Sequence, residues 1–192
     1  MQRDSCGGIG ERQMQRQTQW TRRAQRNAAK YSGGKNKGEG RMQKFVCSDT
    51  GIALTKGFEG LRLKAYRDCA DVLTVGYGHT GPDVVIGLVI DEARAEELLM
   101  ADLREAIACV NRAVTAAITQ NQFDALADFC FNVGCGAFLN STLLRKVNAA
   151  DFAGAAAQFA LWVHAGGEVV AGLVRRRKME AEMFVSHSVA SV

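Results

Sequence analysis

The chain has 192 residues, of which 47% are apolar and 23% are charged. This is the composition of an ordinary soluble protein, long enough for one domain or for two small lobes that share a core. A membrane-spanning helix needs about 18 or more consecutive apolar residues, and the strongest apolar run, VVIGLVI at 84–90, is too short. The positively charged N-terminus has no apolar segment behind it, so we expect no signal peptide and synthesis in the cytoplasm.

The net charge of +4 is unevenly distributed. Residues 1–44 hold eleven lysines and arginines against three acids, whereas residues 45–192 hold thirteen against seventeen. The first segment cannot bury enough apolar surface to offset its ordering entropy, so we predict a flexible basic tail. Three roles are open for it: a solubilising extension, attraction to anionic outer-membrane or wall polymers, and nucleic-acid binding. The third is the least favoured, because the tail has too few aromatic side chains to stack on bases.

The cysteines show no CxxC pair, and none has a histidine at metal-ligand spacing. The sequence therefore indicates no zinc site, no other metal and no cofactor. We expect free thiols in a reducing compartment for the six cysteines, which are Cys6, Cys47, Cys69, Cys109, Cys130 and Cys135.

The folded pattern begins near Phe45. Apolar residues at helical spacing predict a helix over 52–63, which carries Glu59 near its end. Residues 68–81 predict a β-hairpin, because a turn is followed by the β-branched run 72–75 and then by two glycines. A short third strand is expected after the turn that follows.

Asp91 is a good N-cap residue and opens a long pattern of apolar residues at helical spacing that reaches Val114. Further helices are predicted at 120–132, 141–147, 151–164 and 172–186. The predicted fold class is α+β and mostly helical. It comprises a small α+β lobe at 45–90, a connecting helix with a helical lobe at 91–187, and a short tail at 188–192. A cleft between two such lobes commonly binds extended substrates.

Glu59 and Asp68 stand at the end of the predicted helix and at the start of the predicted hairpin. From these positions both carboxyl groups are expected to face one cleft, and Thr74 offers a hydroxyl from the neighbouring strand. Cleavage of a glycosidic bond uses one protonated carboxyl as the acid and one ionised carboxylate on the other side of the bond. The neighbouring Phe58 and Leu61 supply apolar surroundings that favour the protonated form of Glu59.

The string EGLRLKAYRD at 59–68, followed by TVGYGHT at 74–80, resembles the motif of the tailed-phage lysozymes, or endolysins, of glycoside hydrolase family 24. Two later segments resemble that family in the same order: FNVGCGAFLNSTLLRKVN at 131–148 and GLVRRRKMEAEMF at 172–184. The resemblance covers about residues 48–186 and excludes the basic tail.

The resemblance implies a lysozyme-like two-lobed fold, and a monomeric muramidase that cleaves the β-1,4 bond between N-acetylmuramic acid and N-acetylglucosamine in peptidoglycan. It implies that Glu59 is the general acid, that Asp68 activates or supports the attacking water, and that Thr74 positions that water. By similarity, four more residues are expected to line the saccharide groove, although each also has a structural interpretation as a core, loop or cap residue: Thr80, Phe131, Asn132 and Ser141.

Two charged features are interpreted structurally. His79 is expected to pair with Asp102 on the long helix, which occupies the matching family position, rather than to act as a base. The run 175–178 (RRRK) is short and is followed by two acids. It is interpreted as a solvated helix face or a contact to anionic cell wall, not as a nucleic-acid site.

The resulting interpretation is a phage endolysin for host cell lysis, held in the host cytoplasm until a separate holin opens the membrane. Two alternatives remain. A lytic transglycosylase needs an acid but no attacking water, which leaves Asp68 and Thr74 without a role. A non-catalytic basic protein that binds wall or membrane needs none of the three residues.

If the basic tail targets anionic surface polymers, deleting residues 1–41 is expected to slow the lysis of intact cells and to leave the lysis of permeabilised cells unchanged. Turbidity loss of the two cell preparations measures this. Equal rates for the full and the shortened chain on intact cells would exclude targeting.

Overall fold

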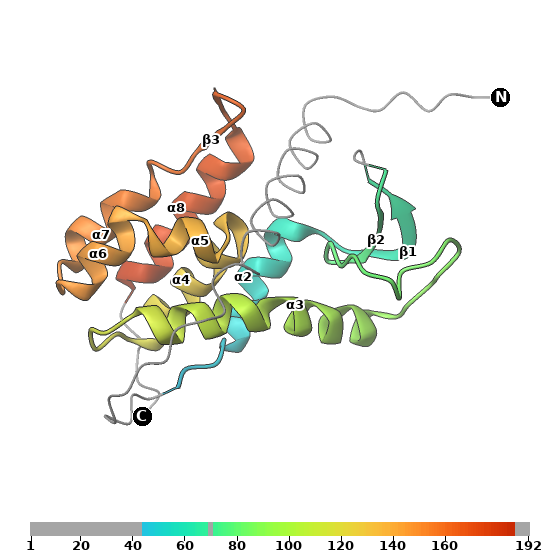
Figure 1. Cartoon of the computed structure of the whole chain (residues 1–192), viewed down its shortest axis with the longest axis horizontal. Helices are drawn as coiled ribbons and strands as arrows, with labels where there is room; N and C mark the ends of the chain where they lie inside the picture. The colour runs from blue at the N-terminus through green and yellow to red at the C-terminus, as the bar shows by residue number, and fades with distance from the viewer. Residues whose placement is uncertain (1–43, 69–70, 187–192) are drawn as a thin grey trace.

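The computed structural model describes residues 44–68 and 71–186, and the basic tail predicted at 1–44 lies almost entirely outside them. The helices between residues 120 and 185 form one body, and a long helix at residues 92–113 runs from it to a small antiparallel sheet (Figure 1). The architecture is α+β and mostly helical, which confirms the predicted fold class. Within the described ranges no helix is both long and apolar enough to cross a membrane.

The first described helix, α2 (Asp49–Glu59), begins at the N-cap Ser48 and ends at Gly60. Gly60 has φ +69°, a conformation that glycine adopts without steric cost and that ends the helix. The predicted helix over 52–63 was therefore wrong at its C-terminal end. Residues 62 and 63, which the prediction placed in the helix, instead begin strand β1 (Arg62–Arg67). Polar and apolar residues alternate over 62–65, as in a strand.

Strand β1 pairs with β2 (Leu73–Gly76) in an antiparallel hairpin. The predicted hairpin was therefore placed too late, because its first strand precedes Asp68 rather than following it. The expected third strand is reduced to residues 88–90 along the other edge of β1, with an isolated bridge between Lys64 and Val89. The Ala65 N–H donates to the Leu88 carbonyl at 2.8 Å on this edge.

Helix α3 (Glu92–Ala113) begins where predicted, because the Asp91 side chain accepts a hydrogen bond from the Arg94 N–H at 2.8 Å. The first half of α3 packs under the small sheet, where Leu99 and Leu103 are buried with Tyr77. Its second half enters the core of the helical body. One helix therefore fixes the sheet relative to that body.

The helical body contains α4 (Gln120–Val133), α5 (Cys135–Leu139), α6 (Thr142–Asn148), α7 (Phe152–Phe159) and α8 (Ala171–Val185). Helix α4 is buried along almost its whole length and contacts α2, α3, α5 and α8. The helix predicted over 151–164 ends early, because β3 (His164–Ala165) and β4 (Glu168–Val169) form a second small hairpin. Two glycines with positive φ, at 166 and 167, make its turn.

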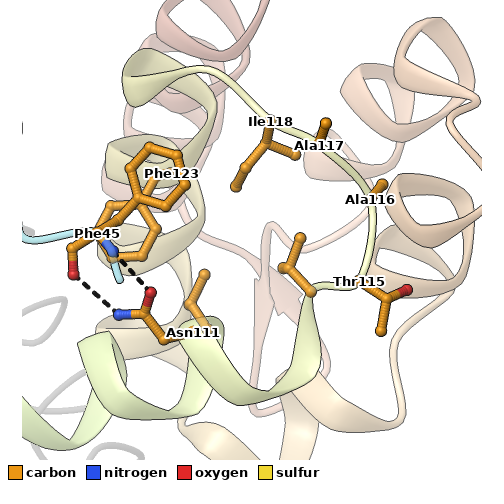
Figure 2. Close-up of a pocket in the computed structure, with 9 residues that line it drawn as sticks. Phe45, Asn111, Thr115, Ala116, Ala117, Ile118 and Phe123 are labelled. Atoms are coloured by element: carbon orange, nitrogen blue, oxygen red, sulfur yellow. Dashed lines mark hydrogen bonds between the residues drawn. The ribbon is translucent and has the colours of Figure 1, made fainter. Parts of the chain in front are cut away.

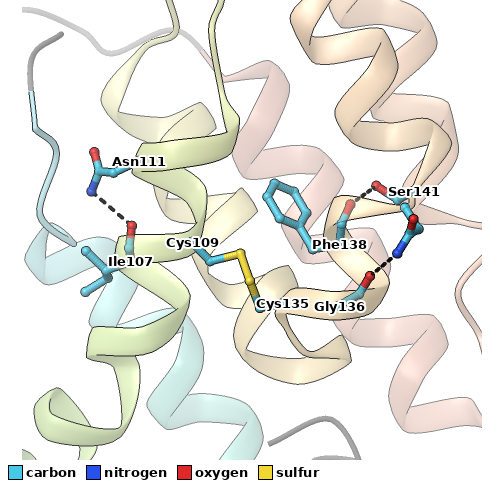
Figure 3. Close-up of a disulfide and its surroundings, with 8 residues drawn as sticks. Ile107, Cys109, Asn111, Cys135, Gly136, Phe138 and Ser141 are labelled. Carbon is cyan, nitrogen blue, oxygen red and sulfur yellow. Dashed lines mark hydrogen bonds between the residues drawn. A yellow bond between two sulfur atoms is a disulfide. The ribbon is translucent and has the colours of Figure 1, made fainter. Parts of the chain in front are cut away.

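The expectation of free thiols was wrong for two cysteines. Cys109 of α3 and Cys135 of α5 form a disulfide with a Cα–Cα distance of 6.0 Å (Figure 3). Spacing along the chain does not indicate this pair, because the short helix α5 that presents Cys135 was not predicted. Cys47 and Cys130 are free thiols, and burial raises the pKa of Cys47 to about 12. Cys6 and Cys69 lie outside the described residues.

Candidate active site

Glu59 is the last residue of α2, and its side chain is 20% exposed. One carboxyl oxygen, Oε1, accepts a hydrogen bond from Arg176 Nη1 at 2.7 Å. The other, Oε2, lies 4.0 Å from the position that a Cβ at Gly78 would occupy. Gly78 has φ +93°, so the backbone after β2 reaches the Glu59 carboxyl in a conformation that other residues rarely adopt.

The pKa of Glu59 is raised above its ordinary value. Burial is the main cause, and the Arg176 guanidinium opposes it without cancelling it. The position of Glu59 at the C-terminal end of α2 acts in the same direction as burial, because the negative end of the helix dipole disfavours a carboxylate there. Glu59 can therefore hold a proton at a pH where an exposed glutamate has lost its own.

Arg176 on α8 is fully buried and joins three helices. Its Nε and Nη2 donate to the two carboxyl oxygens of Asp128 on α4, at 2.9 and 2.7 Å. Thr55 on α2 also donates to Asp128, at 2.8 Å. Burial alone would raise the pKa of Asp128, but the charge and hydrogen bonds of Arg176 outweigh it and the pKa is lowered. Asp128 is therefore an anion that holds Arg176 against Glu59.

The interpretation of residues 175–178 as a solvated face or a wall contact was wrong for its two central members. Arg175 and Lys178 are exposed, but Arg176 and Arg177 are 0% and 1% exposed. Arg177 donates to Asn132 Oδ1 at 2.7 Å. The sequence does contain a signal that these arginines are buried. They share one helical face with an apolar residue at each end of it, at positions 173, 176, 177, 180 and 184.

Asp68 and Thr74 are brought together around a single residue, Val72. The Val72 N–H donates to Asp68 Oδ1 at 2.9 Å, and the Thr74 hydroxyl donates to the Val72 carbonyl at 3.2 Å. Thr74 is 1% exposed, whereas Asp68 is half-buried at the turn that follows β1. The hairpin therefore fixes one carboxylate and one hydroxyl in a defined relation, and the hydroxyl oxygen keeps acceptor capacity for a water.

The four predicted groove residues fall into two groups. Thr80 and Phe131 are half-buried, and Phe131 packs at the junction of the two main apolar clusters. Asn132 and Ser141 are buried. The Ser141 hydroxyl caps α6 by accepting from the Leu144 N–H at 3.0 Å, so its main contact is with the chain itself.

His79 pairs with Asp102 as predicted. Its Nδ1 lies 3.0 Å from both carboxyl oxygens of Asp102, and its Nε2 lies 3.3 Å from those of Asp83. Burial raises the pKa of Asp102, and the hydrogen bond from His79 opposes that rise. The pairing links the end of the hairpin to α3.

A hollow of about 310 Å³ lies on the helical body where the described chain begins (Figure 2). Phe45 forms part of its wall by stacking on Phe123, with ring centroids 5.0 Å apart. The Phe45 N–H donates to Asn111 Oδ1, and the Asn111 side-chain amide donates to the Phe45 carbonyl, both at 2.9 Å. None of the predicted site residues lines it.

Replacing Arg176 with Met is expected to lower the free energy of unfolding by about 3–5 kcal/mol, because it leaves the buried Asp128 carboxylate without its cation. Denaturant unfolding at neutral pH measures the loss. Arg175→Met, one residue away on the exposed face, is the matched control and is expected to stay within about 0.5 kcal/mol of wild type.

The ion pair between Asp128 and Arg176 predicts that the free energy of unfolding depends on pH. Because the folded-state pKa of Asp128 is lowered, its stabilisation is complete above the ordinary aspartate pKa and is lost as the pH falls below it. The stability gap between wild type and Arg176→Met is therefore expected to narrow in acid. A gap that stays constant down to pH 2 would contradict the ion pair.

The comparisons with known proteins agree with this architecture. The family model for phage lysozyme matches residues 56–180. The endolysin of Bacillus phage B103 is 46% identical over 141 residues, 72% of this chain and 54% of that protein. The endolysin of Salmonella phage P22 is 40% identical over 143 residues, 72% of this chain and 97% of that protein. The chain thus spans about half the length of the Bacillus phage relatives.

Solved structures give the same result. A crystal structure of a P22 lysozyme mutant aligns with TM-score 0.70 and 38% identity, over 74% of this chain and 99% of that one. The muramidase domain of SpmX from Asticaccaulis excentricus aligns with TM-score 0.69 and 38% identity, over 74% of this chain and 99% of that one. From the family match and these alignments, we conclude that the chain belongs to the phage lysozyme family.

Proposed function

We propose that this protein is an endolysin with muramidase activity, which hydrolyses the β-1,4 bond between N-acetylmuramic acid and N-acetylglucosamine in peptidoglycan. The observation that carries the proposal is the Glu59 carboxyl. It has a raised pKa, is partly exposed and is held at 2.7 Å by a buried arginine, beside a hairpin that presents Asp68 and Thr74.

In this proposal the protonated Glu59 donates its proton to the glycosidic oxygen as the bond to the leaving sugar breaks. Arg176 fixes the orientation of that carboxyl through Oε1 and leaves Oε2 on the side of Gly78. As the proton leaves, the carboxylate gains its full attraction to Arg176, so the interaction strengthens along the reaction.

Asp68 acts in its ionised form on the water that attacks the anomeric carbon, or supports the positive charge that develops there. The hydrogen bond from the Val72 N–H occupies one of its carboxyl oxygens and orients the group. The Thr74 hydroxyl, already bonded to the Val72 carbonyl, accepts a hydrogen bond from the same water.

Among the groove residues, we propose that Thr80 and Phe131 contact the saccharide, since both keep exposed surface. Asn132 and Ser141 are proposed to support the groove indirectly. Asn132 orients Arg177, and Ser141 fixes the first turn of α6.

Glu59→Gln is expected to reduce the rate of turbidity loss on purified peptidoglycan at least 100-fold, because removing a general acid costs about 10²–10⁴ in rate. Glu182→Gln, an exposed glutamate on α8, is the matched control. In the wild type, the rate is expected to fall as the pH rises through the raised pKa of Glu59.

The products distinguish the alternatives. Mass spectrometry is expected to show reducing-end muropeptides, whereas 1,6-anhydro products would mean a lytic transglycosylase. Retention of lysis by Glu59→Gln would instead indicate a non-catalytic protein that binds wall or membrane.

We also propose that the enzyme reaches the cell wall from the host cytoplasm through a lesion opened by a separate holin. Expression of the chain alone is then expected to leave the culture density rising, and addition of a membrane-permeabilising agent to cause rapid lysis. Prompt lysis by the chain alone would refute this route.

A further inference from the structure

The backbone reaches the surface beside Glu59 at one residue, Gly78. Residues 74–77 are buried, Gly78 is exposed, and His79 is half-buried. A Cβ placed on Gly78 would lie 4.0 Å from Glu59 Oε2. Apart from its chain neighbours, no other atom of the described residues lies within that distance of this Cβ position. The surface next to the Glu59 carboxyl is therefore bare backbone.

The turn at 76–78 is held in place by its neighbours. The His79 N–H donates to the Val75 carbonyl at 2.9 Å, and the Val75 N–H donates to the His79 carbonyl at 3.0 Å, which closes the turn. Tyr77, in the middle of the turn, is buried against α3. Lys56 Nζ of α2 lies 5.4 Å from the centroid of the Tyr77 ring. Contacts to α2 and to α3 therefore fix where the turn lies.

Arg176 decides which oxygen of Glu59 carries the proton. Its Nη1 donates to Oε1 at 2.7 Å, so a proton on Oε1 would face a cation. The proton of a neutral Glu59 is therefore favoured on Oε2, the oxygen on the side of Gly78. An oxygen that accepts this proton has to come within about 2.6–3.2 Å of Oε2.

We propose that Gly78 is a substrate-contacting residue of the reaction. The glycan crosses the bare backbone at 78, so that its glycosidic oxygen meets Glu59 Oε2, and a side chain at 78 would block this approach. The inference rests on the proposed role of Glu59 as the general acid. It identifies the side from which the scissile bond reaches the acid.

The backbone conformation gives a different reason for a glycine at this position, and a second glycine separates the two reasons. Gly87 has φ +85°, close to the +93° of Gly78, and it is also exposed. A Cβ on Gly87 would meet no atom of the described residues within 4 Å. Alanine therefore has a similar backbone cost at either position. Only alanine at 78 places a methyl group beside Glu59.

The test compares Gly78→Ala with Gly87→Ala. On solubilised peptidoglycan strands, Gly78→Ala is expected to lower kcat about 100-fold, because displacing the reacting oxygen by about 1 Å costs that much. The KM is expected to change little, since the rest of the glycan keeps its contacts. Gly87→Ala is expected to keep the wild-type kcat, although denaturant unfolding is expected to show a similar loss of stability in both variants. Equal kcat values for the two variants would overturn the proposal and leave backbone conformation as the reason for glycine at 78.

A second measurement does not depend on the folding of Gly78→Ala. Glu59→Gln keeps the shape of the side chain but has no carboxyl proton to transfer, so it binds the strands without cleaving them. Backbone amide signals are followed by ¹H–¹⁵N NMR as solubilised strands are added to this variant. The Gly78 signal is expected to move as the strands saturate the protein, and the Gly87 signal to stay in place. A Gly78 signal that does not move at saturation would refute the contact.

These outcomes are separable from failure of the proposed function. If Glu59→Gln cleaved peptidoglycan at the wild-type rate, the assignment of the acid would fall, and the Gly78 signal would still report whether the glycan lies at 78. If Glu59→Gln were inactive and Gly78→Ala fully active, the inference about Gly78 alone would fail.

Discussion

The contact on which the site depends is the clamp of Arg176 between Asp128 and Glu59. It joins α2, α4 and α8 through one guanidinium, and Arg176 lies 117 residues after Glu59 in the chain. A buried arginine is tolerated only where carboxylates meet it with good geometry, and Asp128 supplies two hydrogen bonds at 2.9 and 2.7 Å. Helix α8 thereby orients the Glu59 carboxyl at the end of α2.

The position of the small sheet depends on α3. Buried residues of β2 and of the turn after it, among them Val75 and Tyr77, pack on the first half of that helix, and the pair between His79 and Asp102 fixes the end of the hairpin to it. The second half of α3 is tied to α5 by the Cys109–Cys135 disulfide. A cross-link of this loop size contributes about 3.5 kcal/mol in the chain-entropy account. The first half of α3 is therefore held by the hairpin, and its second half is held by the helical body.

A feature of the fold could be predicted from the sequence where its signal lies within a few neighbouring residues. Helix starts with a side-chain cap, such as those at Asp91 and Ser141, were found because the cap and the apolar spacing lie within a few residues. Strand β1 was missed because Leu61 and Leu63 also fit a helical stripe, and only Gly60 breaks it. The pairing of Asp128 with Arg176 has no local signature, and neither does the disulfide. Both depend on helices that meet only in the folded chain.

Arg176 and Arg177 illustrate why charge alone is a poor guide to exposure. Replacing a buried ionic cluster with well-packed apolar side chains is often neutral or stabilising, so fold stability does not explain why α8 carries two arginines and Glu180 on its buried face. The proposed role of Glu59 as the general acid gives Arg176 a reason to be there. An apolar lining would raise the pKa of Glu59 by burial alone, but it would neither orient the carboxyl nor stabilise the carboxylate left after proton transfer. Arg176 provides both, because it donates a hydrogen bond to the Glu59 carboxyl at 2.7 Å and carries a positive charge beside it.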